Sequence, residues 1–74
     1  MNPTTQAIID RLPKKPILVP AEIAAVYGLK SSNPVLADIK TGKLAASAIN
    51  GRFIVSRSAA IQYIERLEYV PDEA

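Results

Sequence analysis

The fold is decided by residues 20–56, which read PAEIAAVYGLKSSNPVLADIKTGKLAASAINGRFIVS. Pro20 suits the first position of a helix, and apolar residues follow at helical spacing as far as Gly28, which tolerates the left-handed conformation at the end of a helix. Asn33-Pro34 then supplies a second N-cap residue followed by a first-turn proline. We expect this second helix to run to about Thr41. The segment therefore predicts two short helices joined by a tight turn.

A β-hairpin is expected at Asn50-Gly51, which lies between two apolar stretches. Asn-Gly is a strong hairpin signal because both central residues of a type I′ turn need a positive φ. The cross-strand pairs that this turn predicts are Ile49 with Arg52, Ala48 with Phe53, and Ala46 with Val55. On the face that carries the alanines, we expect Phe53 to pack on the helices as a core residue. Ile49 and Ile54 point to the opposite face.

Two further helices are expected on either side of this region. Residues 4–12 combine a threonine N-cap with an apolar face, and Pro13 and Pro16 stop that helix. Residues 17–19 follow as a short extended run. Towards the C-terminus Ser56 is a suitable N-cap, and apolar side chains recur after it at helical spacing. These side chains are Ala60, Tyr63, Ile64 and Leu67, and we expect Tyr63 in the core.

At 74 residues the chain is long enough for one small domain with one core. We divide it into an N-terminal helix and linker (residues 1–16), a main domain (17–69) and an acidic flexible tail (70–74). The order of elements predicts a mainly α fold with a small β-hairpin: a winged helix-turn-helix with an extra short N-terminal helix. In such a fold the second helix enters the major groove of DNA, and the hairpin, or wing, reaches flanking phosphates.

The composition excludes most small-enzyme chemistry. The sequence has no cysteine and no histidine, which rules out a disulfide framework, a zinc finger, a thiol nucleophile and a histidine acid or base. Glu22 and Asp38 lack a third acid that would make them a catalytic group. We expect no enzyme activity, no cofactor and no metal. Apolar runs are far shorter than a membrane span, and the N-terminus lacks a signal-peptide pattern, so we expect a cytoplasmic protein.

Positive charge is concentrated in residues 11–57, which carry eight basic groups against two acids. Residues 58–74 carry one arginine against four acids. A basic body suits a polyanionic partner, because charge asymmetry sets the field that steers association. The alternative is a solvated surface that merely happens to be basic. For Lys14 and Lys15, which lie between two prolines, we favour a solvated linker over phosphate contact.

Three segments resemble the excisionase-type, MerR-like winged helix-turn-helix domains of phages and mobile elements. They read AEIAAVYGL at 21–29, GKLAA at 42–46 and NGRFIVSR at 50–57. The resemblance covers residues 17–67 and implies double-stranded DNA as the partner, contacted by the second helix and the wing. The residues at the corresponding positions are Lys30, Ser31, Ser32, Asn33, Leu36, Ala37 and Lys40 for the helix, with Lys43, Arg52 and Arg57 for the wing.

The resemblance further implies an accessory role on a phage or mobile element, as an excisionase, a recombination directionality factor or a small transcriptional regulator associated with the bacterial nucleoid. Implied partners are further copies of the chain, in a dimer or an array on DNA, and an integrase or another phage protein.

The second helix departs from the family pattern, because one residue more than usual separates Gly28 from Gly42. Lys40 is its one basic residue, and Asp38 would repel phosphate if it faced DNA. We therefore expect Arg52, at the hairpin tip, and the basic loops to contribute more to binding than base readout does.

Two other functions remain open from the residues alone. One is a protein-interaction module, such as an anti-repressor or inhibitor, that keeps the winged fold without reading bases. The other is a small terminase-type packaging domain.

Two apolar groups exceed what so small a domain needs for its core, and we expect at least one to contact a partner. They are Ile8, Ile9 and Leu12 on the N-terminal helix, and Ile49 with Ile54 on the hairpin. For the N-terminal group, packing on the chain's own core is an equal alternative.

Overall fold

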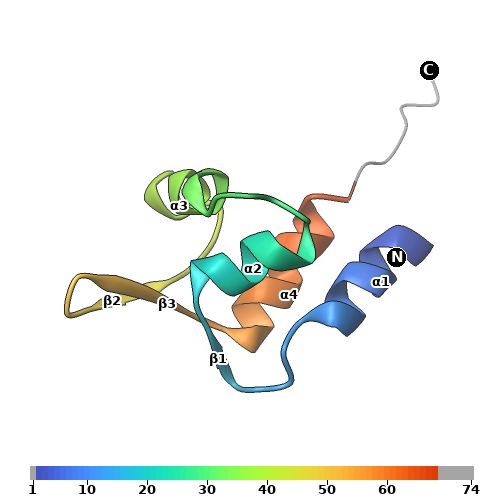
Figure 1. The fold of residues 1–74 in the computed structure, drawn as a ribbon, viewed down its shortest axis with the longest axis horizontal. Coiled ribbons are helices and arrows are strands. Elements are labelled where there is room, and N and C mark those ends of the chain that lie inside the picture. The colour runs from blue at the N-terminus through green and yellow to red at the C-terminus, as the bar shows by residue number, and fades with distance from the viewer. Residues whose placement is uncertain (1, 69–74) are drawn as a thin grey trace.

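A computed structural model describes residues 2–68 as four helices and a small three-stranded antiparallel sheet (Figure 1). The elements are α1 (Pro3–Arg11), β1 (Ile17–Leu18), α2 (Pro20–Val26), α3 (Asn33–Lys40), β2 (Ser47–Ile49), β3 (Arg52–Ser56) and α4 (Arg57–Arg66). The predicted helices and hairpin are confirmed. The sheet has one strand more than the hairpin, so the chain is mixed α/β. The expected acidic tail at 70–74 lies outside the described residues.

β1 is the strand that the sequence did not predict. It pairs antiparallel with β3, with Ile17 opposite Ser56 and Leu18 opposite Val55, and the strand order is β1-β3-β2. The short extended run after the proline linker is therefore an edge strand. It joins the N-terminal part of the chain to the base of the hairpin.

The hairpin forms at the expected turn, with Asn50 at φ 49° and Gly51 at φ 75°. These two positive values are what a type I′ turn requires. β2 pairs antiparallel with β3, and the observed register is Ser47 with Ile54, Ala48 with Phe53, and Ile49 with Arg52. The last two pairs confirm the prediction. The third expected pair, Ala46 with Val55, is not in the ladder because β2 begins at Ser47.

Two of the three expected N-caps lie at other residues. In α1 the cap is Asn2, whose side chain accepts a hydrogen bond from the N–H of Thr5 at 2.8 Å. In α3 the cap is Ser32, and Asn33 is the first helical residue. In α4 the cap is Ser56, as predicted, and its hydroxyl accepts a first-turn N–H at 3.1 Å. Neighbouring polar residues compete for a cap, so the sequence locates the start to within one or two positions.

One core fills the space between the helices and the inner face of the sheet. Its buried side chains are Ile9, Leu12, Leu18, Ile23, Ala24, Val35, Leu44, Val55, Ala60, Tyr63 and Ile64. Tyr63 is confirmed as a core residue, whereas Leu67 is 47% exposed. Ile9 and Leu12 are buried and Ile8 packs against them, so this group packs on the chain's own core and is not an exposed interface.

Phe53 corrects a further expectation, because it is half-buried and is not part of the core cluster. Its alternation along β3 places it on the same face as Val55, which is fully buried. The hairpin projects from the body of the molecule beside α3, however, and α4 packs only near its base (Figure 1). The outer half of that face therefore has no helix directly over it, and Phe53 lies at the edge of a surface groove.

Candidate nucleic-acid interface

The α3–hairpin groove is an open cleft of about 400 Å³ where α3, the hairpin and the start of α2 meet. Its lining residues are Val19, Pro20, Ala21, Ser32, Leu36, Gly51, Arg52 and Phe53. Three residues predicted to contact DNA, namely Ser32, Leu36 and Arg52, thus meet around one cleft. The walls are mostly apolar, and Arg52 supplies a positive charge.

α3 presents most of its surface to solvent. Its buried side chain is Val35, at 1% exposure. Asn33, Ala37 and Lys40 are all exposed, and their spacing of three and four residues puts them on one side of the helix. This outward side has a positive charge at its C-terminal end and no bulky side chain. The helix can therefore lie close against a partner surface.

Asp38, the acid within α3, points towards α4. Its carboxylate accepts a hydrogen bond of 2.5 Å from the hydroxyl of Tyr63, and Asp38 is half-buried. Burial of the ring, together with this bond to Asp38, raises the pKa of the Tyr63 hydroxyl well above its ordinary value. The carboxylate is thereby drawn away from the outward side of α3, where a negative charge would oppose phosphate.

The other acid of the basic segment, Glu22, is also engaged. Its carboxylate forms a salt bridge of 2.7 Å with Lys15, and it accepts the N–H of Val19 at 3.0 Å at the start of α2. The hydrogen bond from Lys15 lowers the pKa of Glu22, with a smaller contribution from the Val19 N–H. Lys15 is therefore paired with a carboxylate of the same chain.

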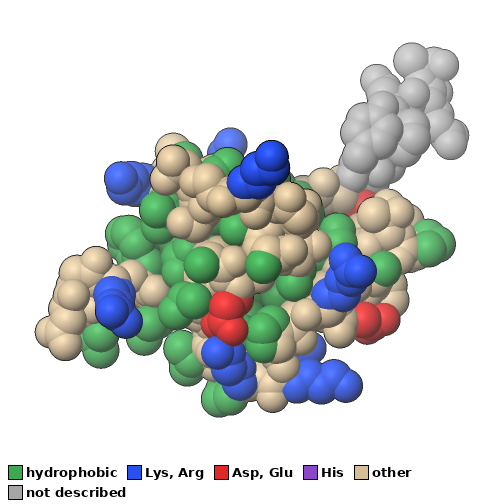
Figure 2. All heavy atoms as spheres, in the orientation of Figure 1, with side chains coloured by type: hydrophobic (Ala, Val, Ile, Leu, Met, Phe, Trp, Pro, Cys, Tyr) green, Lys and Arg blue, Asp and Glu red, His purple; other side chains and the backbone are tan. Residues whose placement is uncertain are grey.

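Four other predicted contact residues keep their charge exposed. They are Lys30, Lys40, Lys43 and Arg52, which form no salt bridge with any residue between 2 and 68. Figure 2 shows basic side chains over α3 and at the outer end of the hairpin, with apolar surface between them. Further basic groups lie on the lower part of the same view, so positive charge extends beyond the groove.

The turn between α2 and α3 is held by its own hydrogen bonds. Gly28 adopts φ 71°, and the N–H of Leu29 donates to the carbonyl of Ala24 at 3.0 Å. The hydroxyl of Ser31 accepts the N–H of Asn33 at 3.1 Å. Ser31 therefore organises the start of α3.

Two predicted wing residues lie away from the groove. Arg57 begins α4, and its Nε donates to the carbonyl of Pro13 at 3.3 Å while its backbone N–H donates to the carbonyl of Pro16 at 2.9 Å. It therefore ties the linker to the base of the hairpin. Lys43 lies next to Tyr63 and Arg66, on the side of α3 that faces α4.

Sequence reasoning missed the apolar wall of the groove and the inward turn of Asp38. The wall joins α2, α3 and the hairpin, and no local pattern shows that these segments meet. The bond from Tyr63 to Asp38 spans 25 positions. A polar residue on the buried side of a predicted helix was the one available signal that Asp38 needs an internal partner.

Comparison with protein-family models, with curated proteins and with solved structures gives no match for this chain. Within residues 2–68 no group of three or more acids, histidines or cysteines is placed to hold a metal ion. None of the helices in that range has the length and apolar character needed to cross a membrane.

Proposed function

We propose that this chain is a DNA-binding protein with a winged helix-turn-helix fold, in which α3 lies in the major groove and the β2–β3 hairpin is the wing. The observation that carries the proposal is the state of the two acids in the basic segment. Glu22 is paired with Lys15, and Asp38 is bonded to Tyr63. The exposed charges around α3 and the wing are then all positive among the described residues.

Binding is proposed to be mainly electrostatic. Lys40 at the C-terminal end of α3 and Arg52 at the wing tip are both exposed, and each supplies one cation to the phosphate backbone. Lys30 adds a third charge before α3. Lysine and arginine contacts to phosphates release counterions, which supplies affinity without reading sequence.

Base readout is proposed to be limited. The outward side of α3 carries Asn33, Ala37 and Lys40. Asparagine can pair with adenine, and alanine can contact the thymine methyl group. So small a set favours recognition in which the shape and deformability of the DNA contribute a large share of the specificity.

The role within the cell follows from the family resemblance of residues 17–67. We propose an accessory DNA-binding protein of a phage or mobile element, acting as an excisionase, a recombination directionality factor or a small regulator of transcription. It would act without catalysis or a cofactor, by positioning itself on DNA beside other proteins.

The apolar α3–hairpin groove supports a second candidate function, a protein-interaction module. Leu36 and Phe53 are half-buried in the groove, and exposed apolar surface of this kind is common at protein interfaces. In that case a partner peptide, such as a segment of a repressor, occupies the cleft, and the basic residues steer it there.

The proposal is tested by duplex DNA binding measured at a series of salt concentrations. If Lys30, Lys40 and Arg52 each contact a phosphate, log K falls with log salt at a slope of about −2.7. Removing two of them in Lys40→Ala/Arg52→Ala lowers the slope to about −0.9 and weakens binding to every sequence.

Lys14→Ala is the matched control, because it removes an exposed positive charge from the linker. It is expected to leave the affinity nearly unchanged. Wild-type protein that binds no duplex at low salt contradicts the DNA proposal. A loss in the linker variant half as large as that in the double variant would show that net charge, and not this surface, controls binding, because the linker variant removes one charge and the double variant removes two. Binding of a repressor-derived peptide, abolished by Leu36→Ala, would support the second candidate.

A further inference from the structure

The outer face of the sheet is a second surface, which shares Arg52 alone with the proposed DNA interface. Antiparallel partners lie on the same face, so the register places one set of residues together across all three strands. This set comprises Ile17, Ser47, Ile49, Arg52, Ile54 and Ser56. Leu18 and Val55 point the other way, into the core. No helix buries the outer set: Ile17 is 46% exposed and Ile49 is 58% exposed.

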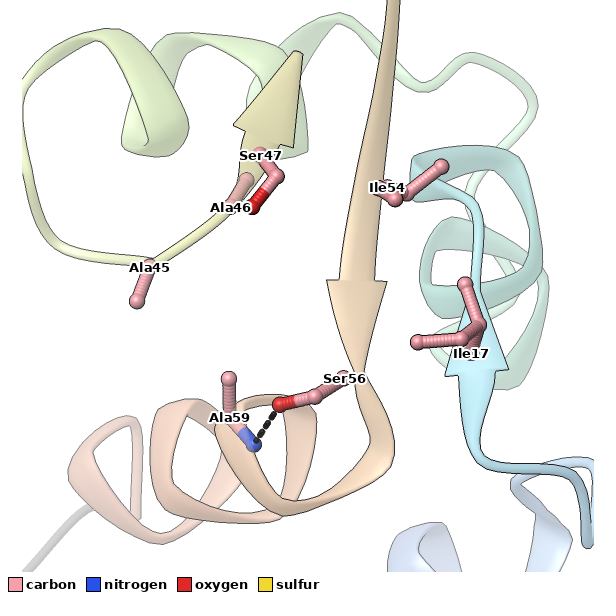
Figure 3. Close-up of a pocket in the computed structure, with 7 residues that line it drawn as sticks. All are labelled: Ile17, Ala45, Ala46, Ser47, Ile54, Ser56 and Ala59. Carbon is pink, nitrogen blue, oxygen red and sulfur yellow. Dashed lines mark hydrogen bonds between the residues drawn. The ribbon is translucent and has the colours of Figure 1, made fainter. Parts of the chain in front are cut away.

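This face carries a hollow of about 220 Å³, which Figure 3 shows between the loop before β2, the strand β1 and the first turn of α4. Its floor and walls are made of small and β-branched side chains: Ile17, Ala45, Ala46, Ser47, Ile54, Ser56 and Ala59. The hydroxyl of Ser56 already accepts the N–H of Ala59. None of these seven residues is charged, so the hollow suits an uncharged apolar side chain.

The same face also carries a side chain of that kind. Ile49 is the most exposed large apolar residue among those described, and it lies on β2 two positions beyond Ser47, which lines the hollow. Two residues of a strand span roughly 7 Å. A protruding isoleucine and an apolar hollow are therefore neighbours on one surface.

We infer that two copies of this chain pair through this face, with Ile49 of each copy seated in the hollow of the other. A two-fold axis between Ile49 and the hollow places Ile49 of each copy against the hollow of the other copy. This is the reciprocal contact of an isologous dimer. Ile17 and Ile54 flank the inserted side chain and are covered by the same contact.

Charge favours a second copy as the occupant. A surface that meets itself places like charges together, so an isologous interface needs an uncharged centre. Arg52 is the one charged residue in the outer set, and it lies at the hairpin tip where it also lines the α3–hairpin groove. The centre of the outer face is thus free of charge.

The pairing leaves α3 and its groove open, because Phe53, which lines the groove, points to the opposite face of the sheet. The inference is therefore independent of the DNA proposal, and either can fail alone. If both hold, the dimer presents two recognition helices. The proposed contact centres on one inserted side chain per copy, so we expect a weak dimer with a dissociation constant on the order of 100 μM.

The test is the molar mass of the full chain, measured by sedimentation equilibrium over a concentration series that spans this value. Wild type is expected to pass from monomer to dimer, and Ile49→Lys is expected to stay monomeric. Leu29→Lys is the matched control, since Leu29 is an exposed leucine (42%) outside the outer face and gains the same charge. It is expected to dimerise as wild type does. Ile49→Ser replaces the lysine variant if circular dichroism shows that the latter is unfolded.

A second measurement locates the contact. The chain has no cysteine, so Ile49→Cys and Ala46→Cys variants can be mixed under mild oxidation. A disulfide between the two variants, formed faster than between two copies of the Ala46→Cys variant, supports the seating of Ile49. A wild-type chain that stays monomeric throughout overturns the inference. A dimer that survives Ile49→Lys also overturns it and points instead to pairing along the open edge of β2, which depends on backbone groups.

Discussion

α1 and α3 begin with the same dipeptide, Asn-Pro, and lie at opposite ends of the molecule (Figure 1). In α1 the asparagine caps the helix, and the apolar side contributes Ile9 to the core. Leu12, the residue directly after the helix, is also buried in the core. In α3 the asparagine is the first helical residue and the helix buries one side chain, Val35. A helix-start signal thus locates the beginning of a helix to within a residue, and the surrounding contacts decide how much of the helix is buried.

α1 is thus a helix that supports the core, whereas α3 is a helix whose outward side is open to a partner. α1 packs along α4 and completes the core, so its side chains act on stability. α3 is held by Val35, by the bond from Asp38 to Tyr63 and by its packing on α2. Its outward side is left open, which a helix needs if it is to enter a groove of DNA. Mutations in the two helices should therefore have opposite effects on stability and on binding.

The largest effect is expected from Leu12→Ala, directly after α1. Leu12 is 2% exposed, and truncating a buried leucine costs about 2–5 kcal/mol of unfolding free energy. For a domain of this size a loss of about 3 kcal/mol lowers Tm by on the order of 15 °C. Thermal unfolding followed by circular dichroism measures it. Leu29→Ala, the same change at an exposed site, is expected to stay within about 0.5 kcal/mol of wild type. Equal shifts in both variants would place Leu12 outside the core.

Tyr63→Phe is expected to have an intermediate effect, because it removes the donor to Asp38. A half-buried carboxylate that loses its partner costs about 1–3 kcal/mol. Urea unfolding at pH 7 measures the loss. Asp38→Asn in the same background should recover part of it, since a neutral amide is easier to leave unpaired. No recovery would mean that the ring's packing, and not the bond, is what the variant disturbs.

Tyr63 also makes the free energy of unfolding depend on pH. Its pKa is raised in the folded chain above the ordinary value of 10.0, so the neutral form is the one that the fold favours. The stabilising contribution is full below pH 10 and falls as the pH rises through and beyond that value. Unfolding free energy measured between pH 8 and pH 11 should therefore drop for wild type and drop less steeply for Tyr63→Phe. Burial also raises the pKa of Tyr27, so some alkaline sensitivity remains in the variant.

The smallest expected effect is the difference in stability between alanine substitutions at the two asparagines. Asn2→Ala removes a capping hydrogen bond to Thr5 and is expected to cost about 1 kcal/mol. Asn33→Ala removes no capping hydrogen bond of α3 and is expected to leave stability within about 0.5 kcal/mol of wild type. Paired chemical denaturation curves compare them. A larger loss at Asn33 would show that it, and not Ser32, caps the helix.

The elements that the sequence predicts well are those encoded locally. Asn50-Gly51 specifies its own turn, and the register of the hairpin follows from it. Gly28 and Gly42 end the two helices as expected, each with a positive φ. Ile17-Leu18 is too short to signal a strand, and its partners at Val55 and Ser56 are far away in the sequence. Its place in the sheet is therefore set by tertiary pairing.

The candidate site likewise has features that local sequence predicts and features that depend on tertiary contacts. Exposure of Lys40 and Arg52 follows from helix and hairpin positions that local patterns predict. The position of Phe53 does not, because alternation assigns a face of a strand but not the layer that covers it. Asp38 and Arg57 likewise take partners, Tyr63 and Pro13, from distant parts of the chain. One acid is drawn away from the proposed surface, and one base is used to hold the fold.

The measurement that tests the central claim most directly is a titration of the isotope-labelled chain with duplex DNA, followed by backbone amide chemical shifts. If α3 is the presented helix, the largest changes fall on residues 30–40 and 50–53, and residues 3–12 keep their shifts. The changes should diminish as salt is raised, because the contacts are mainly to phosphates. Shifts that gather on α1, or an absence of shifts at low salt, would contradict the account.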